Sequence, residues 1–213
     1  TAFDLTWCVA VDLERIESFG MESPYTLVDN NEWTMEKLIS MAREGMTPND
    51  DGTYTYNEGT SCVFGLITYN NFSLALLNGS ACFLTQKNDL GMPAFTGTGE
   101  RFSDVVEDIS LAFNTDGLLN DGFRYEDVFA GRRALFSGVE VKATQKFRSI
   151  KMHYGIVPVP KYNTDQATYY SNVNYEAPLL VIPRTDTTKD RTGRILDTMA
   201  YLSYKDLLPV YYD

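Results

Sequence analysis

Apolar and polar positions follow two rhythms along the chain, one typical of strands and one typical of helices. Four apolar runs have strand length and are bounded by turn residues or prolines: 3–11, 62–67, 154–159 and 179–182. Pro158 and Pro160 have no amide proton for a sheet ladder, so the third strand must end there or lie at an edge. Pro183 stops the fourth run, which we expect to be a buried strand.

Helical periodicity is clearest at 31–45. Apolar residues recur there at i, i+3, i+4 and i+7, namely Met35, Leu38, Ile39 and Ala42. Thr34 is a natural N-cap and Gly45 follows the end of the pattern. Shorter patterns predict helices at 13–19, 74–77, 103–113, 143–148 and 190–202. Strands that alternate with helices predict an α/β fold, a mixed sheet with helices on both faces.

Two of these helices carry more specific expectations. In 103–113 we expect Ser103 to be the N-cap and Val106, Ile109 and Phe113 to point inward. Before 31–45, Trp33 is expected to pack as a hydrophobic staple over the helix start, with contact to a ligand as the alternative.

Composition narrows the class of protein. A length of 213 residues allows one domain or two small ones. The net charge of −11 argues against nucleic acids and anionic membranes as partners, because both require basic patches. No run approaches the roughly 20 apolar residues of a membrane span. An acidic chain with 14 tyrosines fits an exported protein that binds neutral ligands, among other classes.

The sequence offers little for a metal or a cofactor, and we expect neither. Cys8, Cys62 and Cys82 form no CxxC pair, and buried thiols are favoured over a Cys62–Cys82 disulfide. His153 is the single histidine, which excludes a zinc site built on histidines. A Ser-His-Asp triad would have to use this one histidine. Residues 47–58 have the spacing of a calcium loop but begin with Thr47, so a plain Asp-Gly turn is favoured.

Aromatic rings and amides gather in two polar segments, 69–72 and 169–175. The first follows the strand 62–67 and contains Tyr69, Asn70, Asn71 and Phe72; the second contains Asn172, Asn174 and Tyr175. A sugar requires a flat aromatic face for its C–H surface and amides for its hydroxyl groups, and both segments offer these groups. A solvated loop with one packed ring is the alternative for 69–72.

The order of elements in 153–202 resembles the extracellular solute-binding proteins of family 1, the maltose-binding-like receptors of ABC importers. That family has a "YGI-P-P" strand, then a crossover strand and then a helix, as in 154–160, 179–182 and 190–202 here. The helix start W-T-x-E-K-L at 33–38 is also similar to the family. So is the stretch 129–135, through Phe129, Gly131, Ala134 and Leu135. Val11-Asp12-Leu13 departs from the family, which has Asn-Lys there.

The resemblance implies an α/β fold, namely a periplasmic-binding-protein-like (type II) lobe with a mixed sheet flanked by helices on both faces. We expect 1–213 to form a single α/β lobe, lobe 2, with hinge crossover strands near 3–11 and 169–183 and with the remaining lobe outside this chain. The implied ligand-binding residues are Tyr69, Asn70, Asn71, Phe72, Glu140, Asn172, Asn174 and Tyr175. Glu140 would lie in a cleft-edge turn at 138–141, with a salt bridge to Arg132 or Arg133 as the alternative.

The function that the resemblance implies is extracellular binding of a solute, a sugar or an oligosaccharide, for an ABC importer. Its partners would be the permease subunits, and its location would be the cell surface, as a lipoprotein, or the periplasm. A glycoside hydrolase with two carboxylates across a cleft is the enzymatic alternative, but no Asp or Glu lies in a recognisable catalytic pattern, so we expect no enzyme. A sensor that uses the same fold without a transporter is a further alternative.

Overall fold

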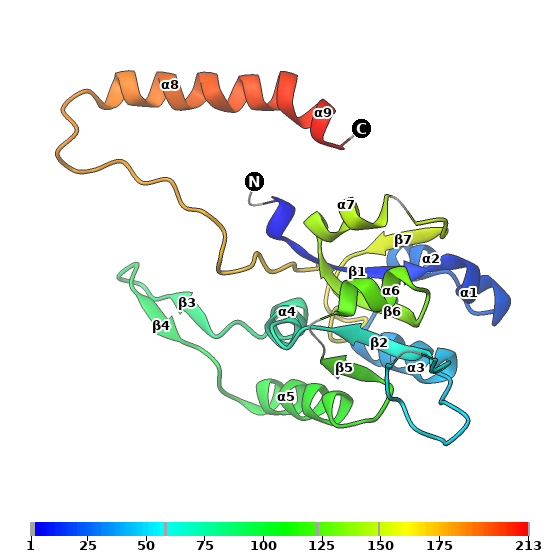
Figure 1. Cartoon of the computed structure of the whole chain (residues 1–213). Coiled ribbons are helices and arrows are strands. Elements are labelled where there is room, and N and C mark those ends of the chain that lie inside the picture. Colours follow the sequence, from blue (N-terminus) through cyan, green and yellow to red (C-terminus); the bar gives the residue numbers. More distant parts are fainter. Residues whose placement is uncertain (1–2, 58, 122–123, 149, 213) are drawn as a thin grey trace. The chain divides into compact units, whose positions relative to one another are not determined.

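Strand β1 (Trp7–Asp12) is buried along its whole length, and its side chains alternate between two separate apolar cores. Trp7, Val9 and Val11 belong to one core, whereas Cys8 and Ala10 belong to the other. This alternation is the period of two that a strand imposes, and it requires helices on both faces of the sheet. Figure 1 labels β1 among the other helices and strands of the chain.

The computed structural model describes residues 3–57, 59–121, 124–148 and 150–212. The chain divides into two units, Thr1–Ala177 and Pro178–Asp213. The first unit contains a five-stranded sheet in the order β5-β2-β6-β1-β7. The other strands are β2 (Phe64–Thr68), β5 (Leu119–Asp121), β6 (Ala134–Glu140) and β7 (Tyr154–Val157).

The sheet is mixed. Strand β2 runs parallel to β5 and β6, whereas β1 runs antiparallel to β6 and β7. In this register Trp7 lies opposite Glu140, and Val11 lies opposite Phe136. The first residues of β1 and the last residues of β6 therefore meet at one end of the sheet, and Asp12 lies at the other end.

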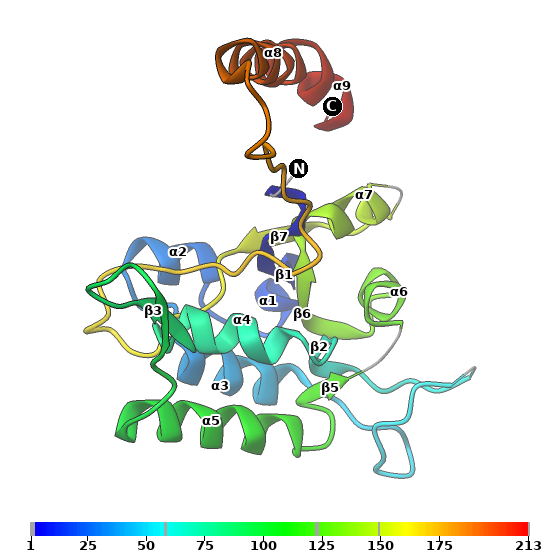
Figure 2. The ribbon, with the colours of Figure 1, turned by 90° about the vertical axis from the view of Figure 1, so that its left-hand side faces the viewer.

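Helices cover both faces of the sheet (Figure 2). One core is formed with α1 (Leu13–Ser18), α2 (Pro24–Asp29), α3 (Met35–Gly45), α4 (Phe72–Gly79) and α5 (Glu100–Phe113). The other is formed with α6 (Tyr125–Ala130), the 3-10 turn η2 (Val141–Ala143) and α7 (Thr144–Phe147). A further 3-10 turn, η1 (Phe3–Leu5), precedes β1. The predicted mixed α/β fold with helices on both faces is confirmed.

A two-stranded hairpin, β3 (Thr85–Lys87) and β4 (Pro93–Phe95), lies outside the main sheet. It pairs antiparallel, with Thr85 opposite Phe95. Its turn and second strand expose the apolar side chains of Leu90, Met92 and Phe95.

Several local predictions are confirmed. Thr34 caps α3, since its hydroxyl oxygen accepts a hydrogen bond from Lys37 N at 3.2 Å. Trp33 is fully buried against Phe136 and donates its indole N–H to Pro158 O at 2.8 Å, which places it in the core. Cys8, Cys62 and Cys82 are buried free thiols. Asp51 accepts from Thr53 N at 2.9 Å within the expected turn.

Two predictions about helix α5 and strand β6 are wrong. Helix α5 begins at Glu100, after Gly99 with φ of 99°, and Ser103 is an internal residue whose hydroxyl donates to Gly99 O. Of the residues predicted to point inward, Ile109 is buried and Phe113 packs against the core, whereas Val106 is exposed and Val105 and Ala112 are buried instead. Where a turn was expected at 138–141, residues 138–140 continue β6 in its pairing with β1, and Val141 begins η2.

The second unit, Pro178–Asp213, contains α8 (Lys189–Leu202), the π-helical turn η3 (Ser203–Leu207) and α9 (Leu208–Tyr212). Pro209 lacks an amide proton and its ring crowds the preceding turn, which explains why the helix widens before it. The predicted buried strand at 179–182 is wrong: this segment has no regular structure, and Leu179 is 87% exposed. An apolar run becomes a strand only where another strand pairs with it, and within the described residues none does.

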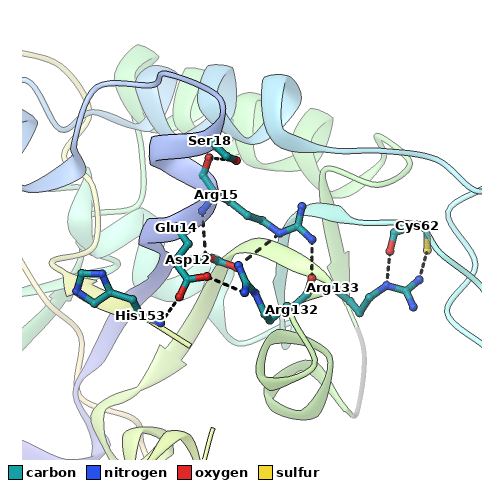
Figure 3. Close-up of polar contacts among 8 residues, drawn as sticks. All are labelled: Asp12, Glu14, Arg15, Ser18, Cys62, Arg132, Arg133 and His153. Atoms are coloured by element: carbon teal, nitrogen blue, oxygen red, sulfur yellow. Dashed lines mark hydrogen bonds and ion pairs between the residues drawn. The ribbon is translucent and has the colours of Figure 1, made fainter. Parts of the chain in front are cut away.

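Charged side chains bind the far end of β1 to the loop after α6 (Figure 3). The Asp12 carboxylate is fully buried, caps α1 by accepting from Arg15 N at 3.1 Å, and lies 3.3 Å from Arg132 Nε. Arg132 also pairs with Glu14 at 2.7 Å, so the salt bridge considered between Arg132 and Glu140 does not form. The backbone N–H of His153 donates to Glu14, and this bond is the main cause that lowers the pKa of the Glu14 carboxyl.

None of the described helices is both long enough and apolar enough to cross a membrane. Among the same residues, no group of three or more His, Cys, Asp or Glu side chains is arranged to hold a metal ion.

Candidate functional site

A pocket of about 340 Å³ lies at the end of the sheet where β1 begins and β6 ends. We call it the asparagine pocket, because four of its lining residues are asparagines. Its lining is Trp7, Asn71, Leu74, Leu77, Asn78, Phe83, Leu84, Thr85, Asn172, Val173, Asn174 and Tyr175. All of these residues belong to the first unit.

Helix α4 supplies one wall of the pocket. Asn71, Leu74 and Asn78 recur at i, i+3 and i+7 and therefore lie on one face of the helix. Asn71 precedes the first helical residue, but its side chain makes no capping hydrogen bond. The side-chain amides of Asn71, Asn78 and Asn172 have no hydrogen-bond partner within the described part of the chain. These groups are available to a ligand.

The opposite wall is the segment 172–175, which pairs with the residues before β1. Trp7 N donates to Asn172 O at 2.9 Å, and Asn174 N donates to Leu5 O at 2.8 Å. Thr6 and Val173 form an isolated antiparallel bridge between these two bonds. This pairing fixes the backbone of the wall, and all four residues 172–175 contribute to the lining.

Behind this wall lies a buried polar contact. The Asn174 side-chain N–H donates to Oε1 of Glu140, and Lys142 pairs with Oε2 of the same carboxylate. Glu140 is only 4% exposed, so its charge depends on these two partners. Burial raises the pKa of the Cys8 thiol to about 12, and the nearby Glu140 charge adds to this shift.

Aromatic rings border the pocket at its base and at its rim. Trp7, at the base, is 2% exposed and packs against Phe72 with ring centroids 5.6 Å apart. Phe83 meets Tyr170 edge to face at 5.2 Å. Tyr175 is 76% exposed, so its ring is free to lie against the apolar face of a bound molecule.

The structure brings together four of the eight predicted ligand-binding residues, namely Asn71, Asn172, Asn174 and Tyr175. Phe72 is fully buried in the core, one residue away from the lining. Glu140 lies behind Asn174 and is not part of the lining. Tyr69 stacks on Tyr125 at 6.5 Å, and Asn70 is exposed; neither lines the pocket.

The remaining lining residues were not among the predicted ligand-binding residues, although the sequence contains a signal for some of them. Asn78 is one helical period beyond Asn71 and was read only as a helix stop. Phe83, Leu84 and Thr85 belong to the start of the hairpin, in a stretch that gave no clear pattern. The sequence gives Trp7 no feature that separates it from the other residues of its strand. Its place at the end of the sheet depends on the register with β6.

A larger cavity of about 690 Å³ lies between α3 and α5. Its lining includes Glu36 and Arg43 of α3 and Asp108 of α5, and none of the predicted ligand-binding residues. Burial, together with the charges of Asp104, Glu107 and Glu36, raises the pKa of the Asp108 carboxyl. This groove between two surface helices offers no set of free amides, so the asparagine pocket is the better candidate.

The fold is similar to that of several solved structures, whereas comparisons of the sequence found no match. No family model matches the sequence, and no curated protein matches it. Among solved structures, the ABC substrate-binding protein Lmo0181 from Listeria monocytogenes, in complex with cycloalternan, matches 75% of this chain and 38% of its own, with 12% identity and a TM-score of 0.54. The fold is of the periplasmic-binding-protein type.

Two further solved structures agree. The GacH receptor of Streptomyces glaucescens, known unliganded and in complex with acarbose, matches 78% of this chain and 39% of its own, with 15% identity and a TM-score of 0.54. UspC of M. tuberculosis matches 75% of this chain and 42% of its own, with 15% identity and a TM-score of 0.53. The chain spans about two fifths of the length of these structures. The resemblance inferred from the sequence is thus confirmed at the level of the fold.

Proposed function

We propose that this chain binds a carbohydrate and that the asparagine pocket supplies its contacts. The observation that carries the proposal is the set of three amides, on Asn71, Asn78 and Asn172, that have no partner within the described residues and meet at one pocket. Each amide both donates and accepts, which is what a ring of sugar hydroxyls requires. The exposed ring of Tyr175 and the ring of Phe83 suit the C–H face of a sugar.

Binding without hydrolysis agrees with the same lining. A glycoside hydrolase requires two carboxyl groups that flank the scissile bond. Among the described residues that line the asparagine pocket, none is Asp or Glu. The carboxylate of Glu140, behind the wall of the pocket, is already engaged by Asn174 and Lys142. These features support a binding protein over a carbohydrate-active enzyme.

We propose further that the chain acts as part of the receptor of an ABC importer. The Listeria and Streptomyces proteins, whose structures contain cycloalternan and acarbose, support an oligosaccharide as the ligand class. The chain matches about two fifths of their length, which supports a second lobe that closes over the ligand. The partners would then be permease subunits, and the location would be the periplasm or the cell surface, there as a lipoprotein.

The test is an NMR titration of the ¹⁵N-labelled chain with acarbose and with cycloalternan. Because one lobe holds only part of the contacts, we expect dissociation constants no tighter than about 1 mM, with shifts concentrated at Asn71, Asn172 and Tyr175. The variant N172A should weaken binding about fivefold, since one amide of several is removed. The matched control N30A changes an exposed asparagine at the end of α2 and should leave binding unchanged.

Two results would count against the proposal. Absence of shifts with either sugar up to its solubility would contradict carbohydrate binding at this pocket. Micromolar affinity of these 213 residues would contradict the sharing of contacts between two lobes.

A further inference from the structure

Glu140 is a buried carboxylate at the end of β6, next to the asparagine pocket but outside its lining. Oε1 accepts from the Asn174 side chain, and Oε2 pairs with Lys142. A carboxylate that is removed from water is stable only with such partners, so this position demands both of them.

The contact with Glu140 determines how the Asn174 amide is oriented. An ionised carboxylate only accepts hydrogen bonds, so the amide must turn its N–H₂ group toward Glu140. Its oxygen then faces the other way, where it accepts from Glu176 N at 3.1 Å. Asn174 is 8% exposed, and both ends of its side chain are engaged.

This orientation matters because Asn174 lies between the two residues that present free groups to the pocket. Its backbone N–H donates to Leu5 O, and the neighbouring Asn172 O accepts from Trp7 N. These two backbone bonds hold the wall to the residues before and at the start of β1. The Asn174–Glu140 bond adds the only side-chain link from this wall to β6 among the described residues.

We propose that Glu140 is a positioning residue of the asparagine pocket, which holds the segment 172–175 through Asn174 so that Asn172 and Tyr175 face a ligand. Glu140 itself touches no ligand in this arrangement, in contrast to the direct contact that the sequence suggested. The inference rests on the proposed function of the pocket and assigns the residue that gives the pocket its shape before a sugar arrives.

The test compares E140A, E140D and E140Q with the wild-type chain. In E140A the Asn174 amide loses its acceptor, so backbone amide exchange at Asn174 and Trp7 should become about tenfold faster, and acarbose affinity about tenfold weaker. E140D keeps the charge beside Lys142 but withdraws the carboxylate by one carbon, and should change both quantities in the same direction. E140D also keeps the test decisive if E140A does not fold.

E140Q is the rescue variant, because the amide oxygen of glutamine accepts the same hydrogen bond from Asn174. We expect its exchange and affinity to lie within about twofold of the wild type. D12A is the matched control: it removes a buried, paired carboxylate from the opposite end of β1. Exchange at Asn174 and Trp7, measured relative to Val9, should not change in D12A.

The outcomes separate the inference from the function on which it rests. If the wild-type chain binds acarbose and E140A binds it equally well with unchanged exchange, the positioning role is overturned. If no chain binds acarbose or cycloalternan, the proposed function fails and the pocket role of Glu140 fails with it, even where exchange shows that the Asn174 contact exists. Loss of affinity in E140A and E140D, with rescue in E140Q, supports the inference.

Discussion

Asp12 shows how one side chain can serve a helix and a loop together. It ends β1, caps α1 through Arg15 N, and pairs with Arg132, which adopts a positive φ of 59°. A non-glycine residue in this left-handed region is under strain and requires compensating contacts. The ion pairs with Asp12 and Glu14 provide such contacts for Arg132.

We expect D12A to lower the free energy of unfolding by about 2 kcal/mol, since it removes the cap and leaves Arg15 and Arg132 without this partner. Urea denaturation followed by circular dichroism measures the change. D12N keeps an oxygen for the cap and should lose about half as much. A loss below about 0.5 kcal/mol in D12A would show that the buried carboxylate contributes little.

At the scale of elements, the decisive contact is the close approach of β6 to α4. Gly138 lies beside Thr68 of β2, whose hydroxyl donates to Gly138 O at 2.8 Å. A Cβ at position 138 would lie 2.7 Å from the Phe72 ring and 2.7 Å from the Thr68 hydroxyl. The absence of a side chain at Gly138 therefore allows the start of α4, and with it Asn71, to lie close to the sheet.

The variant G138A should destabilise the first unit by about 2 kcal/mol, because the added methyl group displaces the Phe72 ring. Near-ultraviolet circular dichroism should change with it, and the NMR signal of Asn71 should shift. The control is G193A in α8, where a Cβ meets nothing within 4 Å and the helix should gain about 0.5 kcal/mol. Equal stability of G138A and the wild type would contradict the close approach.

At the scale of the whole molecule, the two units differ in how they bury apolar residues. The first unit contains both cores, whereas no residue of α8 or of the following π-helical turn is buried. The second unit also exposes a run of apolar side chains, with Leu180 at 68% and Val181 at 79%. Exposed apolar groups of this kind promote association in water.

We expect a chain that ends at Ala177 to keep the fold of the first unit, because every residue of the two cores, as far as the structure describes them, lies before position 178. Its Tm should change by less than about 2 °C, and it should self-associate less than the full chain. Calorimetry and light scattering after size-exclusion chromatography measure these two quantities. A loss of cooperative unfolding in the shorter chain would show that the second unit is needed for stability.

Much of the fold could be predicted from the sequence, because local patterns carry it. The spacing in α3, its Thr34 cap and the prolines after β7 depend on neighbours within a few residues. The run at 179–182 was misread for the opposite reason. A strand requires a partner, and apolar composition does not reveal whether a partner is present.

The candidate site was predicted in part, through residue types rather than positions. Amides and rings at 69–72 and 172–175 identified the right segments, but only Asn71 of the first group reaches the pocket. Helical geometry decided this outcome, since Asn71 and Asn78 share a face that Phe72 does not.

The sequence by itself determined the α/β class, most helices and the strands β1, β2 and β7, because these follow from short-range periodicity. Only the tertiary structure decided that Asn71, Asn78 and Asn172 meet at one pocket and that Glu140 lies behind it. Those residues are far apart in the chain. Trp7 N donates to Asn172 O and the Trp7 ring packs against Phe72 at the start of α4, and the register of β1 against β6 places Glu140 opposite Trp7. A register is a property of paired strands, and a single strand's sequence does not contain it.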